Sequence, residues 1–142
     1  MKIVKAINEC RVITPDRAKL ILRLAVGGLV LLHGLFKLSH PAMVTGFIAG
    51  AFMHAHLPGF LAYLVYVGEV IAPIMLLVGY QTKIAALLVA IDLLVAILIA
   101  HMGQIFMLGQ GGGAAIELQL MYLLGAVAIF GLGAEKYTLW RK

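Results

Sequence analysis

The sequence predicts an all-α integral membrane protein, a four-helix bundle with an interfacial or re-entrant segment between its first and second helices. The chain is 63% apolar and 12% charged, with a mean hydropathy of +1.07, whereas soluble domains are about half apolar and a quarter charged. Because one crossing takes about 20 residues, 142 residues accommodate four crossings and no sizeable soluble domain. We therefore predict a single domain over residues 1–142, with spans at about 20–38, 60–79, 84–101 and 115–132.

The first 19 residues are predicted to form a basic arm that is retained and not cleaved as a signal peptide. Charge is spread evenly through this arm, and no small-x-small cleavage site follows the next apolar run, so it does not resemble a signal peptide. Thr14, Pro15 and Asp16 are typical of a helix start, with a hydroxyl cap, a proline at the first position and an acid near the positive end of the dipole. The first helix is expected from Pro15 to Leu38.

Residues 39–59 predict an interfacial loop or a short dipping helix. The segment carries three histidines and is bounded by prolines, yet it is too apolar for an ordinary exposed loop. His54 and His56 lie beside Met53, a pattern also compatible with an outward copper or zinc contact. Two ligands on one loop are a weak signal, and we favour the interfacial loop.

The second span, within Tyr63–Tyr80, carries a lone carboxylate, Glu69, near its centre. Pro73 has no N–H to donate to the carbonyl four residues earlier, which belongs to Glu69, so a kink is expected there. Tyr66 lies one turn before Glu69 on the same side of the helix and can donate a hydrogen bond. An acid in hydrocarbon costs on the order of 2.5 to 3.5 kcal/mol unless it is compensated.

The third span follows a short turn at 80–83, and the fourth follows an uncharged, Gly-rich segment at 102–114. Asp92 and His101 are nine residues apart, which places them on opposite faces of a straight helix. Either Asp92 faces a partner subunit or His101 lies beyond the helix end, and we favour the second interpretation. The run GQGGG lacks the Lys-Ser/Thr ending of a phosphate loop, which excludes that motif.

The basic residues outside the spans predict how the protein is oriented in the membrane and which charged groups it contacts. Five lie before the first span, one lies between the second and third spans, and three lie at the carboxy terminus. This positive-inside pattern predicts cytoplasmic termini, an inner (plasma) membrane location and anionic lipid head groups, not nucleic acid, as the partner. The single cysteine, Cys10, excludes a disulfide or CxxC pair within the chain. No haem, Fe–S, flavin or nucleotide signature is found.

This topology assigns a depth to each ionisable residue in the spans. Arg23 falls near the cytoplasmic face, Glu69 and Asp92 near the midplane, and four residues from three helices near the outer face: His33, Lys37, His101 and Glu117. Ionisable groups in membrane helices are functional candidates. Two imidazoles, an ammonium and a carboxylate can bind and protonate a carbonyl or quinol oxygen. The alternative is that these groups only set helix register, with Arg23 and Lys37 as snorkelling anchors.

The same residues carry a resemblance to the DoxX family of small four-helix membrane proteins. The similar parts are an Arg at 23, HG-x-x-K at 33–37, GE at 68–69, a His at 101 and a Glu at 117. Asp92 is not part of that pattern, and the family's terminal G-x-G-x-x-SLD is kept only in outline, at Gly131 and Gly133. The resemblance implies a bacterial or archaeal inner-membrane protein linked to quinone redox work, similar to small subunits of quinol oxidases or thiosulfate:quinone oxidoreductases.

Three functions follow as hypotheses. The first is a quinone-binding redox subunit or accessory, in which electrons pass to a separate partner protein; a homo-oligomer stays open. The second is a proton-coupled permease for a small solute, with Glu69 beside the Pro73 kink as its gate. The third is a non-catalytic anchor for a soluble enzyme. For the first we assign no metal, His33, Glu69, His101 and Glu117 as catalytic residues, and Arg23, Lys37 and Tyr66 as ligand-binding residues.

Overall fold

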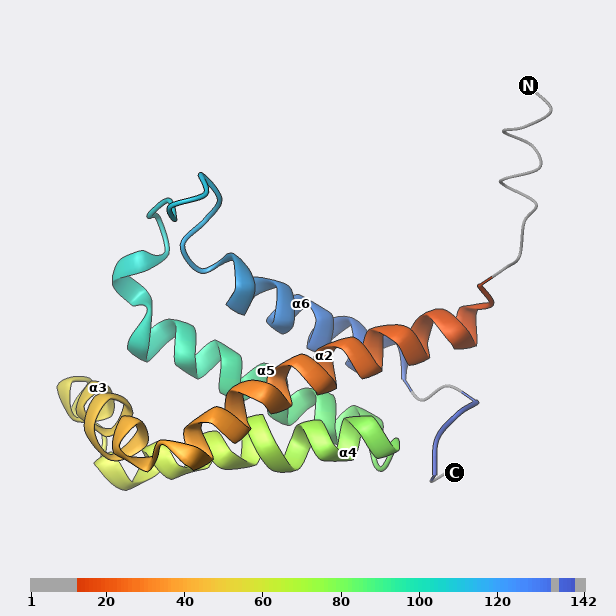
Figure 1. The fold of residues 1–142 in the computed structure, drawn as a ribbon, viewed down its shortest axis with the longest axis horizontal. Helices are drawn as coiled ribbons and strands as arrows, with labels where there is room; N and C mark the ends of the chain where they lie inside the picture. The colour runs from red at the N-terminus through yellow and green to blue at the C-terminus, as the bar shows by residue number, and fades with distance from the viewer. Residues whose placement is uncertain (1–12, 134–135, 140–142) are drawn as a thin grey trace.

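The computed structural model describes residues 13–133 and 136–139. Several sequence predictions lie outside the described residues: most of the basic arm, Cys10 and two of the three carboxy-terminal basic residues. The described segments are helical apart from their connections, and they run back and forth between two ends of the molecule (Figure 1).

The first helix, α2 (Pro15–Ser39), begins where the sequence predicts it. The Thr14 hydroxyl accepts a hydrogen bond from the Arg17 N–H at 3.3 Å, Pro15 occupies the first turn and Asp16 is the acid in that turn. At the other end the His40 N–H donates to the Lys37 carbonyl at 3.2 Å. The predicted helix Pro15–Leu38 is thus confirmed to within one residue.

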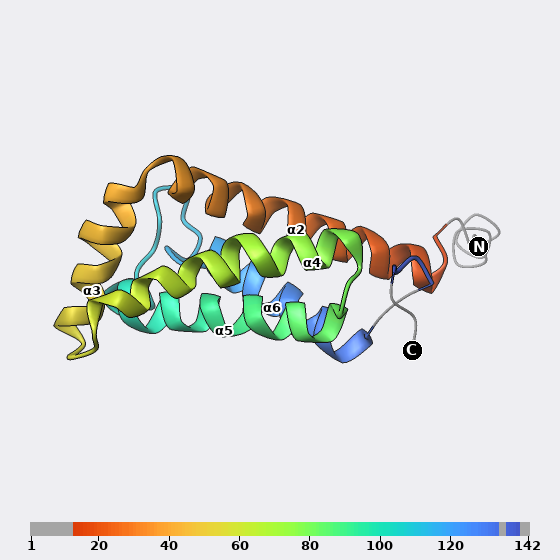
Figure 2. The same ribbon diagram turned by 90° about the horizontal axis from the view of Figure 1, so that it is seen from below.

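The connection after α2 is a short helical segment, one of the two forms that the sequence left open. It consists of a π-helical part, η1 (Met43–Ile48), followed by α3 (Ala49–His54). Both lie at the end of the bundle opposite the start of α2 (Figures 1 and 2). This segment therefore lies across one end of the bundle and does not run alongside the long helices.

The second helical path runs from Gly59 to Val78 with three different hydrogen-bonding geometries. It begins as a 3-10 helix, η2 (Gly59–Leu64), widens into a π-helix, η3 (Val67–Ile71), and continues as α4 (Ala72–Val78). Pro73 is the second residue after the π-helical part, and the irregularity expected at Glu69 is this wide turn. Gly79, with φ of 73°, ends α4 in a Schellman motif, in which the Tyr80 N–H donates to the Met75 carbonyl at 2.9 Å.

The chain then forms an antiparallel pair, α5 (Thr82–Ala100) and α6 (Glu117–Leu132), joined by a loop with one 3-10 turn, η4 (Met102–Gln104). The start of α2, the turn between α4 and α5 and the end of α6 share one end of the bundle (Figure 2). Among the described residues, α2, the Gly59–Val78 path and α5 are long and apolar enough to cross a membrane, while α6 has 16 residues.

Small side chains fill the centre of the bundle, and large ones cover its outside. The buried cluster includes Val30, Ala86, Val89 and Ala126, whereas Leu32 and many other large apolar side chains are exposed. In lipid such side chains need no burial against protein, and small residues let helix backbones approach closely. The predicted all-α membrane bundle with an added segment between its first two long helices is therefore confirmed.

Candidate functional site: a charged cavity among apolar helices

A cavity of about 420 Å³ lies among the helices, and residues of η1 and α3 belong to its lining. Helices α2, α3, α5 and α6 and the segments η1 to η3 all contribute to its lining, which is mostly apolar, with Val30, Phe47, Leu61 and Ile99 among the lining residues. The polar members of the lining are His33, Lys37, Glu69, Asp92, His101, Gln119 and Tyr122. A largely apolar hollow with a few convergent polar groups is typical of small-molecule sites.

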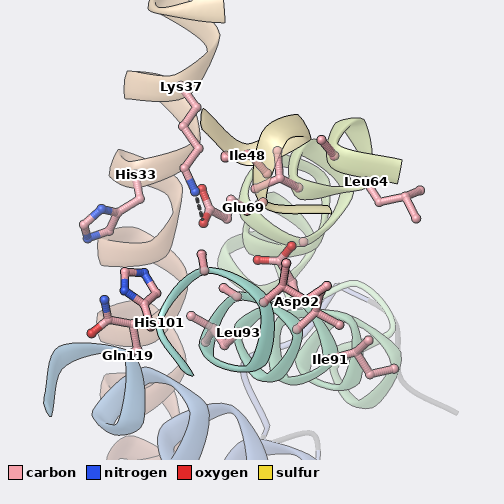
Figure 3. Close-up of a pocket in the computed structure, with 18 of the residues that line it drawn as sticks. His33, Lys37, Ile48, Leu64, Glu69, Ile91, Asp92, Leu93, His101 and Gln119 are labelled. Atoms are coloured by element: carbon pink, nitrogen blue, oxygen red, sulfur yellow. Dashed lines mark hydrogen bonds and ion pairs between the residues drawn. The ribbon is translucent and has the colours of Figure 1, made fainter. Parts of the chain in front are cut away.

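An ion pair between Lys37 and Glu69 crosses the cavity from α2 to η3 (Figure 3). Lys37 Nζ donates to Glu69 Oε1, and the side chains of the two residues are 16% and 7% exposed. This pairing is the compensation that a buried carboxylate requires in a membrane. The second oxygen, Glu69 Oε2, is buried and has no hydrogen-bond partner among residues 13–133 and 136–139.

Two glycines bring the charged helices together. A Cβ atom added to Gly34 of α2 would overlap the backbone carbonyl of Glu69, and one added to Gly68 would overlap the side chain of Asp92 on α5. The π-helical part η3 is therefore in direct contact with α2 on one side and α5 on the other. These contacts determine that Lys37, Glu69 and Asp92 meet.

Asp92 lies next to Glu69 in the cavity, and the site assignment made from the sequence missed it (Figure 3). Its Oδ2 atom is buried without a hydrogen-bond partner in the described part of the chain. The available signal was an acid in the middle of an apolar span, whose role the sequence alone left open. His101 lies just past the end of α5, so it lines the same cavity as Asp92. The interpretation that His101 lies beyond the helix end is confirmed.

The two cavity histidines lie on the side of the cavity that borders α6 (Figure 3). The His33 ring packs edge-to-face on Tyr122 of α6, with 5.8 Å between ring centroids. His101 Nδ1 lies 3.1 Å from Gln104 Oε1, and this contact orients the imidazole. The chain thus places two imidazoles beside Gln119, across the cavity from the acidic pair.

Three of the assigned site residues do not reach this cavity. Glu117 was expected to converge with the outer histidines, but its side chain is exposed and its carboxylate lies over Gly113 in the preceding loop. Tyr66 donates its hydroxyl to the Lys37 carbonyl at 3.4 Å and so closes the end of α2. Arg23 lies at the opposite end of α2. The expected convergence of four outer residues therefore holds for His33, Lys37 and His101 but not for Glu117.

Arg23 attaches the carboxy-terminal segment to the bundle. Its side chain is 2% exposed, and Nη2 donates to the Tyr137 carbonyl at 2.8 Å. The Nη1 atom lies against Gly79, where an added Cβ would also approach the Thr138 Cα to 2.9 Å. The guanidinium thus lies at the carboxy-terminal end of α4, where a positive charge is favourable.

We expect Arg23→Ala to release residues 136–139 from the bundle. Losing a hydrogen bond from a charged group costs about 1.5 to 3 kcal/mol, so the thermal unfolding midpoint in detergent should fall and protease cleavage near Tyr137 should accelerate. The matched control is Lys19→Ala, one turn earlier on the half-buried side of α2. Equal cleavage rates in both variants and the wild type would show that Arg23 does not hold this segment.

Within the described residues, no three His, Cys, Asp or Glu side chains form a group that could hold a metal ion. His54 ends α3, and His56 follows in a turn with a φ of 58°. His54 lines a neighbouring hollow, which shares Phe47, Ala51, Ile99 and Ala100 with the charged cavity. Neither histidine of the HxH pair belongs to the lining of the charged cavity itself.

Apolar helices around a charged cavity define this protein as a multi-pass membrane helix bundle. The model of the DoxX family matches residues 18–102, more than half of the chain, and the chain belongs to the DoxX family. The match includes His33, Lys37, Glu69, Asp92 and His101, whereas Glu117 lies outside it. Comparisons with curated proteins and with solved structures gave no match.

Proposed function

We propose that this DoxX protein binds a quinone in the cavity, as a subunit or accessory of a membrane redox system. One observation carries the proposal: an apolar cavity holds an ion pair, a second carboxylate and two imidazoles. A quinone has a flat ring and a lipid-soluble tail that suit the apolar walls. Its two oxygens require hydrogen-bonding groups, which the walls supply at only a few points.

The position of the polar groups supports this ligand class. His33, His101 and Gln119 lie on one side of the cavity, and Glu69 and Asp92 lie across from them (Figure 3). An imidazole can donate a hydrogen bond to a quinone carbonyl or accept one from a quinol hydroxyl, because one ring nitrogen carries a proton and the other a lone pair. We therefore assign His33 and His101 as the direct contacts, with the Lys37–Glu69 pair fixing the charge beside them. Glu117 is outside the cavity and is not included in this site.

The lining of the cavity also extends to the side surface of the bundle, where the helices would face lipid. Leu64 of η2 and Ile91 of α5 belong to its lining, and they are 58% and 50% exposed. Exposed apolar side chains on membrane helices face lipid. This edge supplies a lateral route by which a lipid-soluble molecule enters without crossing water.

A bound quinone supplies the transfer of electrons and protons, and the chain supplies the binding groups. The sequence has no haem, Fe–S, flavin or nucleotide motif. Electrons would therefore pass to a separate redox protein. For the orientation, the start of α2, the start of α5 and the end of α6 share the end of the bundle opposite α3 (Figure 2). Four basic residues belong to or follow these ends: Arg17, Lys19, Lys83 and Lys136. By the positive-inside rule we place that end in the cytoplasm of a bacterial or archaeal cell and the cavity in the outer half of the membrane.

Quinone binding by the purified protein in lipid nanodiscs tests the proposal. We expect His101→Ala to weaken the binding of a short-tailed ubiquinone or menaquinone about tenfold, which corresponds to the loss of roughly 1.4 kcal/mol of contact. The measurement is equilibrium dialysis with the labelled quinone, together with chromatography of quinone extracted from the protein as purified.

Two control variants separate the cavity from the rest of the chain. His54→Ala removes an imidazole that does not line the cavity, and Glu117→Gln removes the acid that the structure places outside it. Both should bind quinone as the wild type does. Absence of extractable quinone together with equal dialysis results for the wild type and His101→Ala would overturn the proposed function.

A further inference from the structure

The cavity contains two acids and one lysine, a charge imbalance that the quinone site does not require. Glu69 of η3 and Asp92 of α5 lie next to each other, and only Glu69 is paired with Lys37. Each acid retains one buried oxygen, Glu69 Oε2 and Asp92 Oδ2, without a hydrogen-bond partner in residues 13–133 and 136–139. Glu69 is 6% exposed, so its free oxygen is enclosed by protein and not by water.

Among residues 13–133 and 136–139, the elements that line the cavity bring no second fixed positive charge to Asp92. The lining includes Ala51 from α3, Leu61 from η2 and Gln119 from α6, all uncharged. The titratable lining residues are His33, Lys37, Glu69, Asp92, His101 and Tyr122. The two imidazoles lie on the far side of the cavity (Figure 3). Two carboxylates that share an enclosed site cannot both ionise without a compensating cation.

We propose that Glu69 and Asp92 form a proton-binding site that holds one proton between their carboxylates. Binding makes one O–H bond on a carboxylate oxygen, and the second carboxylate accepts the resulting hydrogen bond. Lys37 neutralises the remaining charge, so the loaded triad is neutral as a whole. The ammonium on Glu69 Oε1 also repels a metal cation, which favours a proton as the occupant.

The close contact between η3 and α5 places Asp92 beside Glu69. The side chain of Asp92 fills the space at Gly68, the residue before Glu69, where an added Cβ would overlap it. Loaded, the pair can pass its proton to a carbonyl oxygen in the cavity, and unloaded it can take a proton from a hydroxyl. This exchange with a ligand rests on the proposed quinone function, whereas proton binding by the pair does not.

Infrared spectroscopy of the quinone-free protein in nanodiscs tests the site. We expect the wild type to show the carbonyl stretch of a protonated carboxylic acid that shifts in D₂O and disappears as the pH is raised. Asp92→Asn should abolish this band, since a single paired carboxylate remains, and Glu69→Gln should abolish or displace it. Glu117→Gln is the matched control, because its carboxylate is exposed, and it should retain the band in full.

Helix content by circular dichroism establishes that each variant is folded before its spectrum is compared. The absence of a protonated-carboxyl band from the wild type at every pH at which it is folded would overturn the proposal. Full retention of the band in both Asp92→Asn and Glu69→Gln would also overturn it, as would its removal by sodium or potassium at fixed pH. Quinone dialysis is a separate measurement, so a failure of the proton site and a failure of the quinone function are distinguished.

Discussion

Lys37→Met is expected to destabilise the bundle more than any other single charge removal in the cavity. The substitution keeps the length and apolar character of the side chain but removes the ammonium that pairs with Glu69. Because Glu69 is almost fully buried, its carboxylate would be left as an uncompensated charge, a change that typically costs about 3 to 5 kcal/mol. Unfolding in mixed micelles with increasing denaturing detergent, followed by circular dichroism, measures the loss.

The double substitution Lys37→Met/Glu69→Gln identifies the cause. It removes both charges at nearly constant shape, and we expect it to recover most of the stability lost in Lys37→Met. Glu69→Gln alone should assemble and fold, because Lys37 is 16% exposed and its flexible chain can move the ammonium toward the surface. Lys83→Met is the surface control, since Lys83 is exposed above the Phe130 ring. A double variant no more stable than Lys37→Met would show that the ion pair is not the reason for the loss.

Gly34→Ala is the second substitution from which we expect a large effect. Its added methyl group would overlap the backbone carbonyl of Glu69, and a carbonyl in a helix cannot move aside as a side-chain tip can. Overpacking in a closely packed interior typically costs about 1 to 3 kcal/mol. The separation of α2 from η3 would also lengthen the Lys37–Glu69 contact, so quinone binding should weaken along with stability.

The same helix provides the control for this prediction. Gly28 lies on α2 about two turns earlier, and nothing in the described structure lies within 4 Å of a Cβ added there. Gly28→Ala should be neutral or should stabilise the helix by up to about 1 kcal/mol, because alanine has a higher helix propensity than glycine. Unfolding curves for both variants in the same detergent make the comparison. Equal stability of Gly34→Ala and Gly28→Ala would mean that α2 and η3 are not in the close contact described.

The helix glycines show which part of the helix packing can be predicted from the sequence. Glycines on membrane helices are typical of close helix contacts, and the structure places such contacts at Gly34, Gly27 and Gly125. Gly28 has the same local sequence context as Gly27 but faces open space. Which of two adjacent glycines faces a neighbour depends on the rotation of the helix about its axis, and in an evenly apolar helix hydropathy does not determine that rotation.

The amino-acid sequence by itself determined the class of the protein and the elements that follow from local chemistry. Composition identifies a membrane bundle, Thr14 and Pro15 start α2, and Pro73 requires an irregular helix at Glu69, because each of these depends on lipid solubility or on backbone hydrogen bonds within a few residues.

Only the tertiary structure decided which polar residues meet. Depth in the membrane can be counted along the chain, and that count placed His33, Lys37 and His101 correctly at one end of the bundle. It does not distinguish Glu117, which is exposed beside its own loop, from Asp92, which lies next to Glu69. That choice is made by contacts between segments far apart in the sequence, at Gly34 and Gly68, which determine how α2, η3 and α5 are turned toward one another.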